Sequence, residues 1–138
     1  MKADRFKLIE VEILRANEAR RAMADMAADA QFWNSTAAEL YYTCFYLVQA
    51  LFRLYNLNAH THAGAKSLFA QHFIKTGLIS ERWGKLIAKL LQYRQERNYG
   101  DYGITKEIIL PLTLEVDEFT GLVKNLIAKA GYKLNIES

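Results

Sequence analysis

The chain has 138 residues, enough for one domain with a single core, and 51% hydrophobic and 24% charged residues are ordinary for a globular protein. The longest stretch without a charged residue, Leu40–Phe52, is too short to span a bilayer, and the charged N-terminus lacks the apolar region of a secretory signal. The single cysteine, Cys44, excludes an internal disulfide. We therefore expect a cytoplasmic protein, with no membrane partner, that forms one domain over residues 1–138 with its core at about 5–130.

The first predicted helix is amphipathic and covers about residues 4–28, where apolar residues recur at helical spacing and most charged residues lie off that stripe. The second helix should begin at about Thr36, because Thr36 is an N-cap residue type and Glu39 follows it at the spacing of a capping box. This helix, over about residues 36–55, is apolar nearly all round. We expect it to lie at the centre of the fold, covered on several sides.

The remaining elements are also predicted from helical spacing and from cap and stop residues. No stretch indicates a strand, so the sequence predicts an all-α fold, an up-and-down bundle of four long helices plus one short helix. The predicted elements are a loop over 56–62, a short helix over about 63–75 stopped by Gly77, a helix over about 80–99 capped by Ser80, and a last helix over about 105–130 capped by Thr105.

The helix predicted over residues 80–99 carries a seam that changes character along its length. Its apolar positions lie on one face, and the same face continues to Arg94, Arg97, Asn98 and Asp101. Residues 82–97 hold five basic residues and one acidic residue, a local charge of +4 against +3 for the whole chain. The polar end is therefore either a solvated helix end with an Arg97–Asp101 pair, or a site held against another helix or subunit.

The residue types in this stretch suit RNA better than a metal. Arginine presents a planar fork that matches phosphate, and tyrosines such as Tyr99 and Tyr102 can stack on a base. Histidine, the usual group for moving protons near neutral pH, is absent from the stretch. The three histidines and the cysteine of the chain show no metal-ligand spacing, so we expect no metal and no cofactor.

Three blocks of the sequence share their order and spacing with one known family. They are Ala38–Tyr46 (AELYYTCFY) followed by Ala50 and Leu51, Thr61–Gly64 followed by Phe69, and Arg94–Tyr102 (RQERNYGDY). They are similar to the family patterns YYAxF, HxG…F and RxxADYGD. Over about residues 5–130 the chain thus resembles the HEPN superfamily and, within it, the small proteins grouped as UPF0332.

The resemblance implies a homodimeric helical bundle in which Arg-containing motifs of two subunits face one cleft that binds RNA or a nucleotide. It also implies a toxin-like protein whose antitoxin is a minimal nucleotidyltransferase; in some such pairs the partner adds a nucleotide to a tyrosine near the motif, here Tyr99 or Tyr102. Many active members are metal-independent ribonucleases with an Arg-x4–6-His motif. Carried onto this sequence, the resemblance implies catalytic roles for Arg94, Asn98 and Tyr99 and binding roles for Arg97, Asp101, Tyr102 and His62.

Two departures from the family pattern bear on catalysis. Asn98 stands where this subgroup usually has aspartate, and the motif histidine is missing, since the fifth residue after Arg94 is Tyr99. Two interpretations therefore remain open. The chain binds, and as a ribonuclease cleaves, RNA at a dimer cleft, or it is a non-catalytic dimeric interaction module whose polar motif is an interface network.

Overall fold

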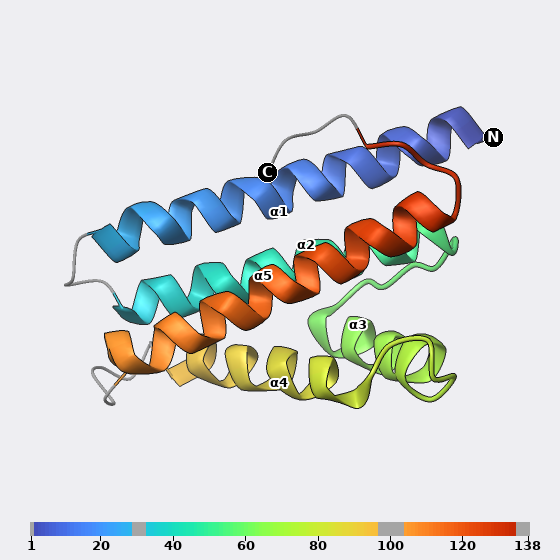
Figure 1. Cartoon of the computed structure of the whole chain (residues 1–138). Coiled ribbons are helices and arrows are strands. Elements are labelled where there is room, and N and C mark those ends of the chain that lie inside the picture. Colours follow the sequence, from blue (N-terminus) through green and yellow to red (C-terminus); the bar gives the residue numbers. More distant parts are fainter. Residues whose placement is uncertain (1, 29–32, 97–103, 135–138) are drawn as a thin grey trace.

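The computed structural model describes residues 2–28, 33–96 and 104–134, which form helices and connecting loops without a strand. Figure 1 shows the long helices running in alternating directions, as predicted for an up-and-down bundle. The helices are α1 (Lys2–Ala28), α2 (Trp33–Leu54), α3 (His62–Phe69) continued by the π-helical segment η1 (Ala70–Ile74), α4 (Glu81–Glu96) and α5 (Lys106–Lys129).

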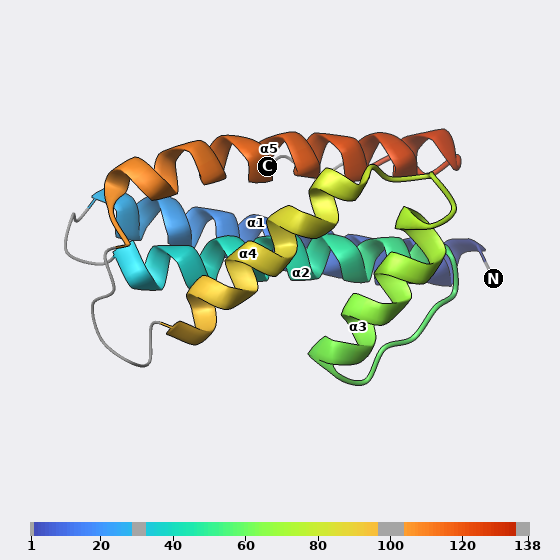
Figure 2. The ribbon, with the colours of Figure 1, turned by 90° about the horizontal axis from the view of Figure 1, so that it is seen from below.

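Helix α2 is the centre of the bundle, and α1, α4 and α5 all pack against it. This confirms the expectation from its almost continuous apolar surface, because a helix without a polar face is stable only when several neighbours cover it. Its fully buried residues include Leu40, Cys44, Leu47, Leu51 and Phe52. In Figure 2, α4 crosses α2 obliquely and α3 lies beside them.

The start of α2 differs from the prediction. The described part of the helix covers Trp33–Leu54, so the chain is already helical three residues before Thr36, which is itself buried within the helix. The capping-box spacing of Thr36 and Glu39 therefore does not mark the helix start. The hydroxyl of a threonine inside a helix can bond other groups than the free amides of the first turn, so spacing alone could not place the start.

The predicted helix over 63–75 is also not uniform. After α3 the hydrogen-bond ladder slips from i+4 to i+5 through η1, and the amide of Lys75 donates to the carbonyl of Ala70 at 2.9 Å. Phe69 and Phe73 remain buried across the change, with ring centroids 5.6 Å apart. Gly77 then has φ +80°, a left-handed conformation that glycine adopts without strain, which confirms it as the stop.

The seam of α4 begins on the core as predicted. Trp83, Leu86 and Leu90 are buried, and the same face continues to Arg94, which is half-buried. The start of α4 agrees with its predicted cap, because Ser80 Oγ accepts from the amide of Arg82 at 3.4 Å. Thr105 occupies the predicted N-cap position of α5, but its side chain makes no capping hydrogen bond. None of the helices in the described ranges combines the length and apolar character needed to cross a membrane.

Candidate functional site

Arg94 ends the seam of α4 against two adjacent tyrosines of α2. Its Nε donates a hydrogen bond to the hydroxyl of Tyr42 at 3.0 Å. The guanidinium carbon lies 5.1 Å from the ring centroid of Tyr42 and 5.5 Å from that of Tyr41, within the range of cation–π attraction. Within residues 2–28, 33–96 and 104–134 the guanidinium is thus held by ring faces and one hydroxyl, and these leave its remaining N–H groups for another acceptor.

Tyr41 and Tyr42 point in different directions because successive residues of an α-helix are rotated by about 100°. Tyr41 is buried, with 3% of its surface exposed, whereas Tyr42 is half-buried. Their rings meet edge to face at 5.7 Å. Arg94 therefore lies over the junction of two rings, one facing the interior and one facing the surface.

His62 reaches the same place from a third element. It is the first residue of α3, and Thr61 caps that helix by accepting a hydrogen bond from the amide of Gly64 at 2.8 Å. A Cβ at Gly64 would lie 3.1 Å from the Thr61 hydroxyl, so glycine lets this cap close tightly. Nδ1 of His62 lies 2.8 Å from the hydroxyl of Tyr41, and the His62 ring packs on Phe45 at 4.5 Å. The cap thus fixes His62 against α2.

The pKa values of this cluster shift for identifiable reasons. Burial lowers the pKa of His62 from its ordinary value, and the positive charge of Arg94 lowers it further. Burial raises the pKa of Tyr41, which the charge of Arg94 partly offsets. Near neutral pH the cluster therefore holds a neutral imidazole, a protonated phenol and a guanidinium cation. It can bind an anion with Arg94 and accept a proton on His62.

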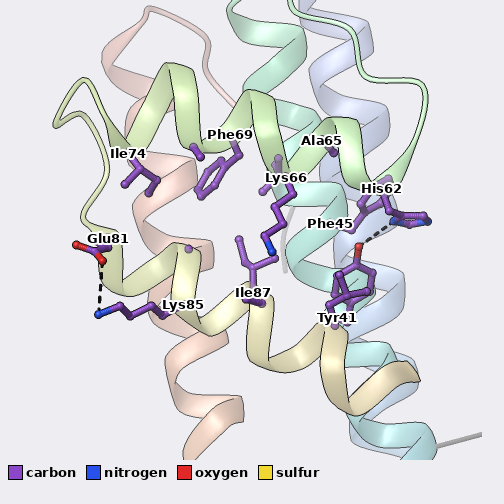
Figure 3. A pocket seen from close by; sticks show the side chains of 15 residues that line it. Tyr41, Phe45, His62, Ala65, Lys66, Phe69, Ile74, Glu81, Lys85 and Ile87 are labelled. Atoms are coloured by element: carbon purple, nitrogen blue, oxygen red, sulfur yellow. Dashed lines mark hydrogen bonds and ion pairs between the residues drawn. The ribbon is translucent and has the colours of Figure 1, made fainter. Parts of the chain in front are cut away.

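A cavity of about 270 Å³ begins at Tyr41 and His62 and extends between α2, α3 and α4. Figure 3 shows the Tyr41–His62 hydrogen bond at one end of this cavity and the Glu81–Lys85 pair at the other. The cluster is therefore open to a space lined mainly by apolar side chains.

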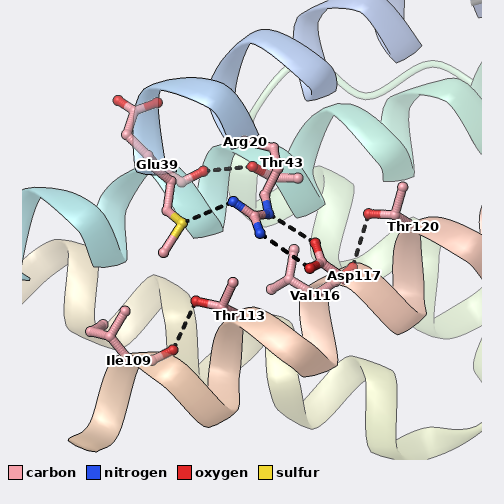
Figure 4. A network of polar contacts seen from close by, with 9 residues as sticks. Arg20, Glu39, Thr43, Ile109, Thr113, Val116, Asp117 and Thr120 are labelled. Carbon is pink, nitrogen blue, oxygen red and sulfur yellow. Dashed lines mark hydrogen bonds and ion pairs between the residues drawn. The ribbon is translucent and has the colours of Figure 1, made fainter. Parts of the chain in front are cut away.

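A second polar network lies away from this cluster, where α1 faces α5. Arg20 donates to both carboxylate oxygens of Asp117, at 2.8 and 3.1 Å, and its third nitrogen meets the sulfur of Met23 at 3.2 Å (Figure 4). Thr43, Thr113 and Thr120 each bond a carbonyl of their own helix, four residues earlier. Of these contacts, the Arg20–Asp117 pair joins two helices, α1 and α5, and the others lie within one helix.

The structure thus positions two of the residues named by the sequence, Arg94 and His62, and brings them to the same pair of tyrosines. The fold also supplies the cluster with a histidine, His62, whereas the sequence around Arg94 contains none. Sequence reasoning missed Tyr41 and Tyr42 as site residues, although their adjacency in the AELYYTCFY block was a usable signal. The other named residues, Arg97, Asn98, Tyr99, Asp101 and Tyr102, lie outside the described residues.

A model of the HEPN domain matches residues 10–126, most of the chain. The chain belongs to the HEPN domain family. The resemblance inferred from the three sequence blocks is therefore confirmed, and the all-α bundle is consistent with this assignment.

Three proteins that are similar to this HEPN chain narrow its assignment within the family. It is 28% identical over 83% of its length to a protein of Methanocaldococcus jannaschii named "Putative toxin", with 86% of that protein covered. It is 30% identical over 75% of its length to a second protein of that organism with the same designation, of which 74% is covered. A UPF0332 protein of Gloeobacter violaceus is 30% identical over 64% of the chain and 68% of its own length.

Proposed function

We propose that this HEPN chain is the toxin of a toxin–antitoxin pair and acts on RNA as a metal-independent ribonuclease. The observation that carries the proposal is the convergence of Arg94 and His62 on the Tyr41–Tyr42 pair. Arginine matches the oxygens of a phosphodiester, and a neutral histidine is a general base near neutral pH. The two relatives named as toxins support the same class of function.

In this proposal, His62 takes the proton of a ribose 2′-hydroxyl as the 2′ oxygen attacks the adjacent phosphorus. The bond from phosphorus to the 5′ oxygen breaks, and that oxygen takes a proton from water, leaving a 2′,3′-cyclic phosphate and a 5′-hydroxyl. Arg94 stabilises the charge that develops on the phosphoryl oxygens. Nε2 of His62 can act as the base when Nδ1 carries the ring hydrogen and donates it to the Tyr41 oxygen, 2.8 Å away.

The proposal includes a homodimer and a minimal nucleotidyltransferase as the antitoxin, both implied by the family resemblance. The surface beside Arg94 supports a dimer, because α2 presents the half-buried aromatic rings of Tyr42 and Tyr46 there. Tyr46 stacks on Tyr42 at 6.5 Å and meets Phe45 edge to face at 5.6 Å. Aromatic residues are enriched in protein interfaces, and two such faces would bring two Arg94 side chains to one cleft.

The second candidate is a non-catalytic interaction module, and one observation favours it. Arg94 already has partners inside the chain, the Tyr42 hydroxyl and two ring faces. In this second candidate the network has a structural role alone: it orders a subunit interface.

Cleavage of a mixed RNA pool in excess EDTA tests the proposal. The variants are Arg94→Ala and His62→Ala, and each has a matched control in the same protein. Arg82→Ala also removes an arginine of α4, one that lies over Trp83 and contacts Glu118 instead. His72→Ala removes an exposed histidine of η1.

We expect the wild-type protein and both controls to cleave RNA and to leave 2′,3′-cyclic ends, and both site variants to lose at least 100-fold in rate. Mass measurement by light scattering shows whether the dimer persists in each variant. Loss of the dimer in Arg94→Ala, with no cleavage or RNA binding by the wild type, would instead establish the interaction module.

A further inference from the structure

The cavity beside the candidate site has walls that are almost wholly apolar. It occupies about 270 Å³ between α2, α3 with η1, and α4. Aromatic and aliphatic side chains of all these helices line it, and only a few charged side chains reach its rim. The apolar lining comes chiefly from Phe45, Val48, Phe69, Ile74, Ile87 and Leu91.

The two lysines that line the cavity differ in whether an acidic side chain pairs with them. Lys85 is paired with Glu81, with 3.5 Å between Nζ and Oε1. Lys66 also lines the cavity, but among the described residues it has no acidic partner. Figure 3 shows its side chain reaching from α3 toward α4, whereas Lys85 turns toward Glu81. As far as the described residues go, the apolar cavity thus has the ammonium group of Lys66 as a charge without an acidic partner at its mouth.

We propose that this cavity binds an amphiphilic anion of the fatty-acid class, with its hydrocarbon chain inside and its carboxylate at Lys66. The proposal goes beyond the proposed action on RNA and does not depend on it. Burial of hydrocarbon supplies most of the affinity, at about 25 cal/mol for each Å² removed from water, and the ammonium selects the sign of the head group.

The size of the cavity agrees with a medium-length chain. A volume of 270 Å³ is nearly twice that of an engineered apolar cavity of about 150 Å³ that binds benzene, so it suits roughly ten carbon atoms. A chain such as that of decanoate is of this size, whereas butyrate would leave most of the apolar wall uncovered.

A nucleobase suits this cavity poorly. Its ring edges carry several donors and acceptors, and each costs roughly 1–3 kcal/mol when buried without a partner. The lining offers mainly hydrocarbon, and its charged side chains, Lys66, Glu81 and Lys85, are exposed to solvent. The chemistry of the wall therefore favours a hydrocarbon over the base of the RNA proposed to bind at Arg94.

Calorimetric titration of the full chain with decanoate tests the proposal, with Gly84→Leu as a variant that fills the cavity. Gly84 lines the cavity, and a Cβ there would meet only Ile74 at an ordinary 3.8 Å. Gly121→Leu is the matched control, because it makes the same change in α5 where a Cβ would meet nothing within 4 Å. Ala88→Leu fills the cavity from another position and replaces Gly84→Leu if circular dichroism shows that variant unfolded.

We expect decanoate to bind the wild type and Gly121→Leu alike, and to bind Gly84→Leu at least tenfold more weakly. Decylamine, with a similar chain and the opposite charge, should bind the wild type at least fivefold more weakly than decanoate. Lys66→Gln should weaken decanoate about two- to fivefold, as befits an exposed ion pair, and Lys89→Gln, an exposed lysine outside the lining, should not.

The proposal is overturned if decanoate does not bind the folded wild type, or if it binds Gly84→Leu as tightly as the wild type. It is also overturned if a nucleotide binds the wild type and this binding is lost in Gly84→Leu. Arg94→Ala separates this inference from the proposed function. It should bind decanoate normally while losing RNA cleavage, so each proposal can fail while the other stands.

Discussion

The hydroxyl of Tyr41 and Nδ1 of His62 lie 2.8 Å apart, although 21 positions separate the two residues in the chain. The contact joins the middle of α2 to the first residue of α3, and it sets the histidine beside the arginine of α4. The chain lacks a histidine within its Arg94–Tyr102 stretch, yet the fold brings His62 of another helix to Tyr41, over which Arg94 also lies. The predictions below test what this arrangement does and how the bundle supports it.

His62 should titrate below the ordinary histidine value of 6.5, because burial and the charge of Arg94 both disfavour the imidazolium. Nuclear magnetic resonance titration of the His62 ring measures its pKa directly. Removing the charge in Arg94→Ala should raise that pKa toward 6.5. An unchanged His62 pKa in this variant would show that the two side chains do not interact in solution.

The same shift predicts how stability depends on pH. Since the His62 pKa is lower in the folded than in the unfolded chain, the unfolded chain binds more protons between the two values. The His62 contribution to the free energy of unfolding should therefore become less favourable as the pH falls from 6.5 through the lowered pKa, and be constant above 6.5. The difference in unfolding free energy between the wild type and His62→Ala, measured in urea at several pH values, isolates the His62 contribution. A contribution that becomes more stabilising as the pH falls would contradict this prediction.

The two tyrosine hydroxyls should have separable roles. Tyr42→Phe removes the acceptor of Arg94 Nε, so we expect about 1 kcal/mol less stability and about fivefold weaker RNA binding from a less ordered guanidinium. Tyr41→Phe removes the partner of His62 and should lower the rate of RNA cleavage more than the affinity for RNA. Fluorescence anisotropy with labelled RNA, beside single-turnover cleavage, measures both. Equal effects of the two variants on both quantities would argue against separate roles.

Phe119 should be a main support of the core. It is fully buried on α5 and meets the rings of Phe69 at 6.3 Å and Trp83 at 5.5 Å. Phe119→Ala should cost about 3–5 kcal/mol of unfolding free energy, from lost burial and the cavity left behind. Leu114→Ala, at a position 67% exposed on the same helix, should change stability by less than about 0.5 kcal/mol. Denaturant melts compare them, and similar losses would mean that α5 is not anchored through Phe119.

Cys44 should be unreactive in the folded protein. It is fully buried in α2, and burial raises the pKa of its thiol, so almost no thiolate forms near neutral pH. Labelling with an aromatic disulfide should proceed only through opening of the bundle, and its rate should rise in Phe119→Ala about tenfold for each 1.4 kcal/mol of stability lost. Rapid labelling of the wild type without denaturant would show that α2 is exposed by a smaller motion.

The sequence by itself determined where the helices lie and which faces they bury. Hydrophobic spacing is a local property, so it located the central position of α2 and the seam of α4 without knowledge of neighbours, and the residue type of Gly77 marked the stop after η1. The sequence did not show that α2 is already helical before Thr36 or that a π-helical turn follows Phe69, because caps and turn types depend on competing hydrogen bonds. The three sequence blocks also sufficed to identify the family.

Only the tertiary structure decided which side chains meet. Arg94 could be singled out from its place on the seam, and His62 from its family motif, but nothing in their spacing joins them to Tyr41 and Tyr42. That joining depends on the angle at which α4 crosses α2 and on the cap that fixes α3 against them. Both are set by packing between segments far apart in the chain, which periodicity within one helix does not encode.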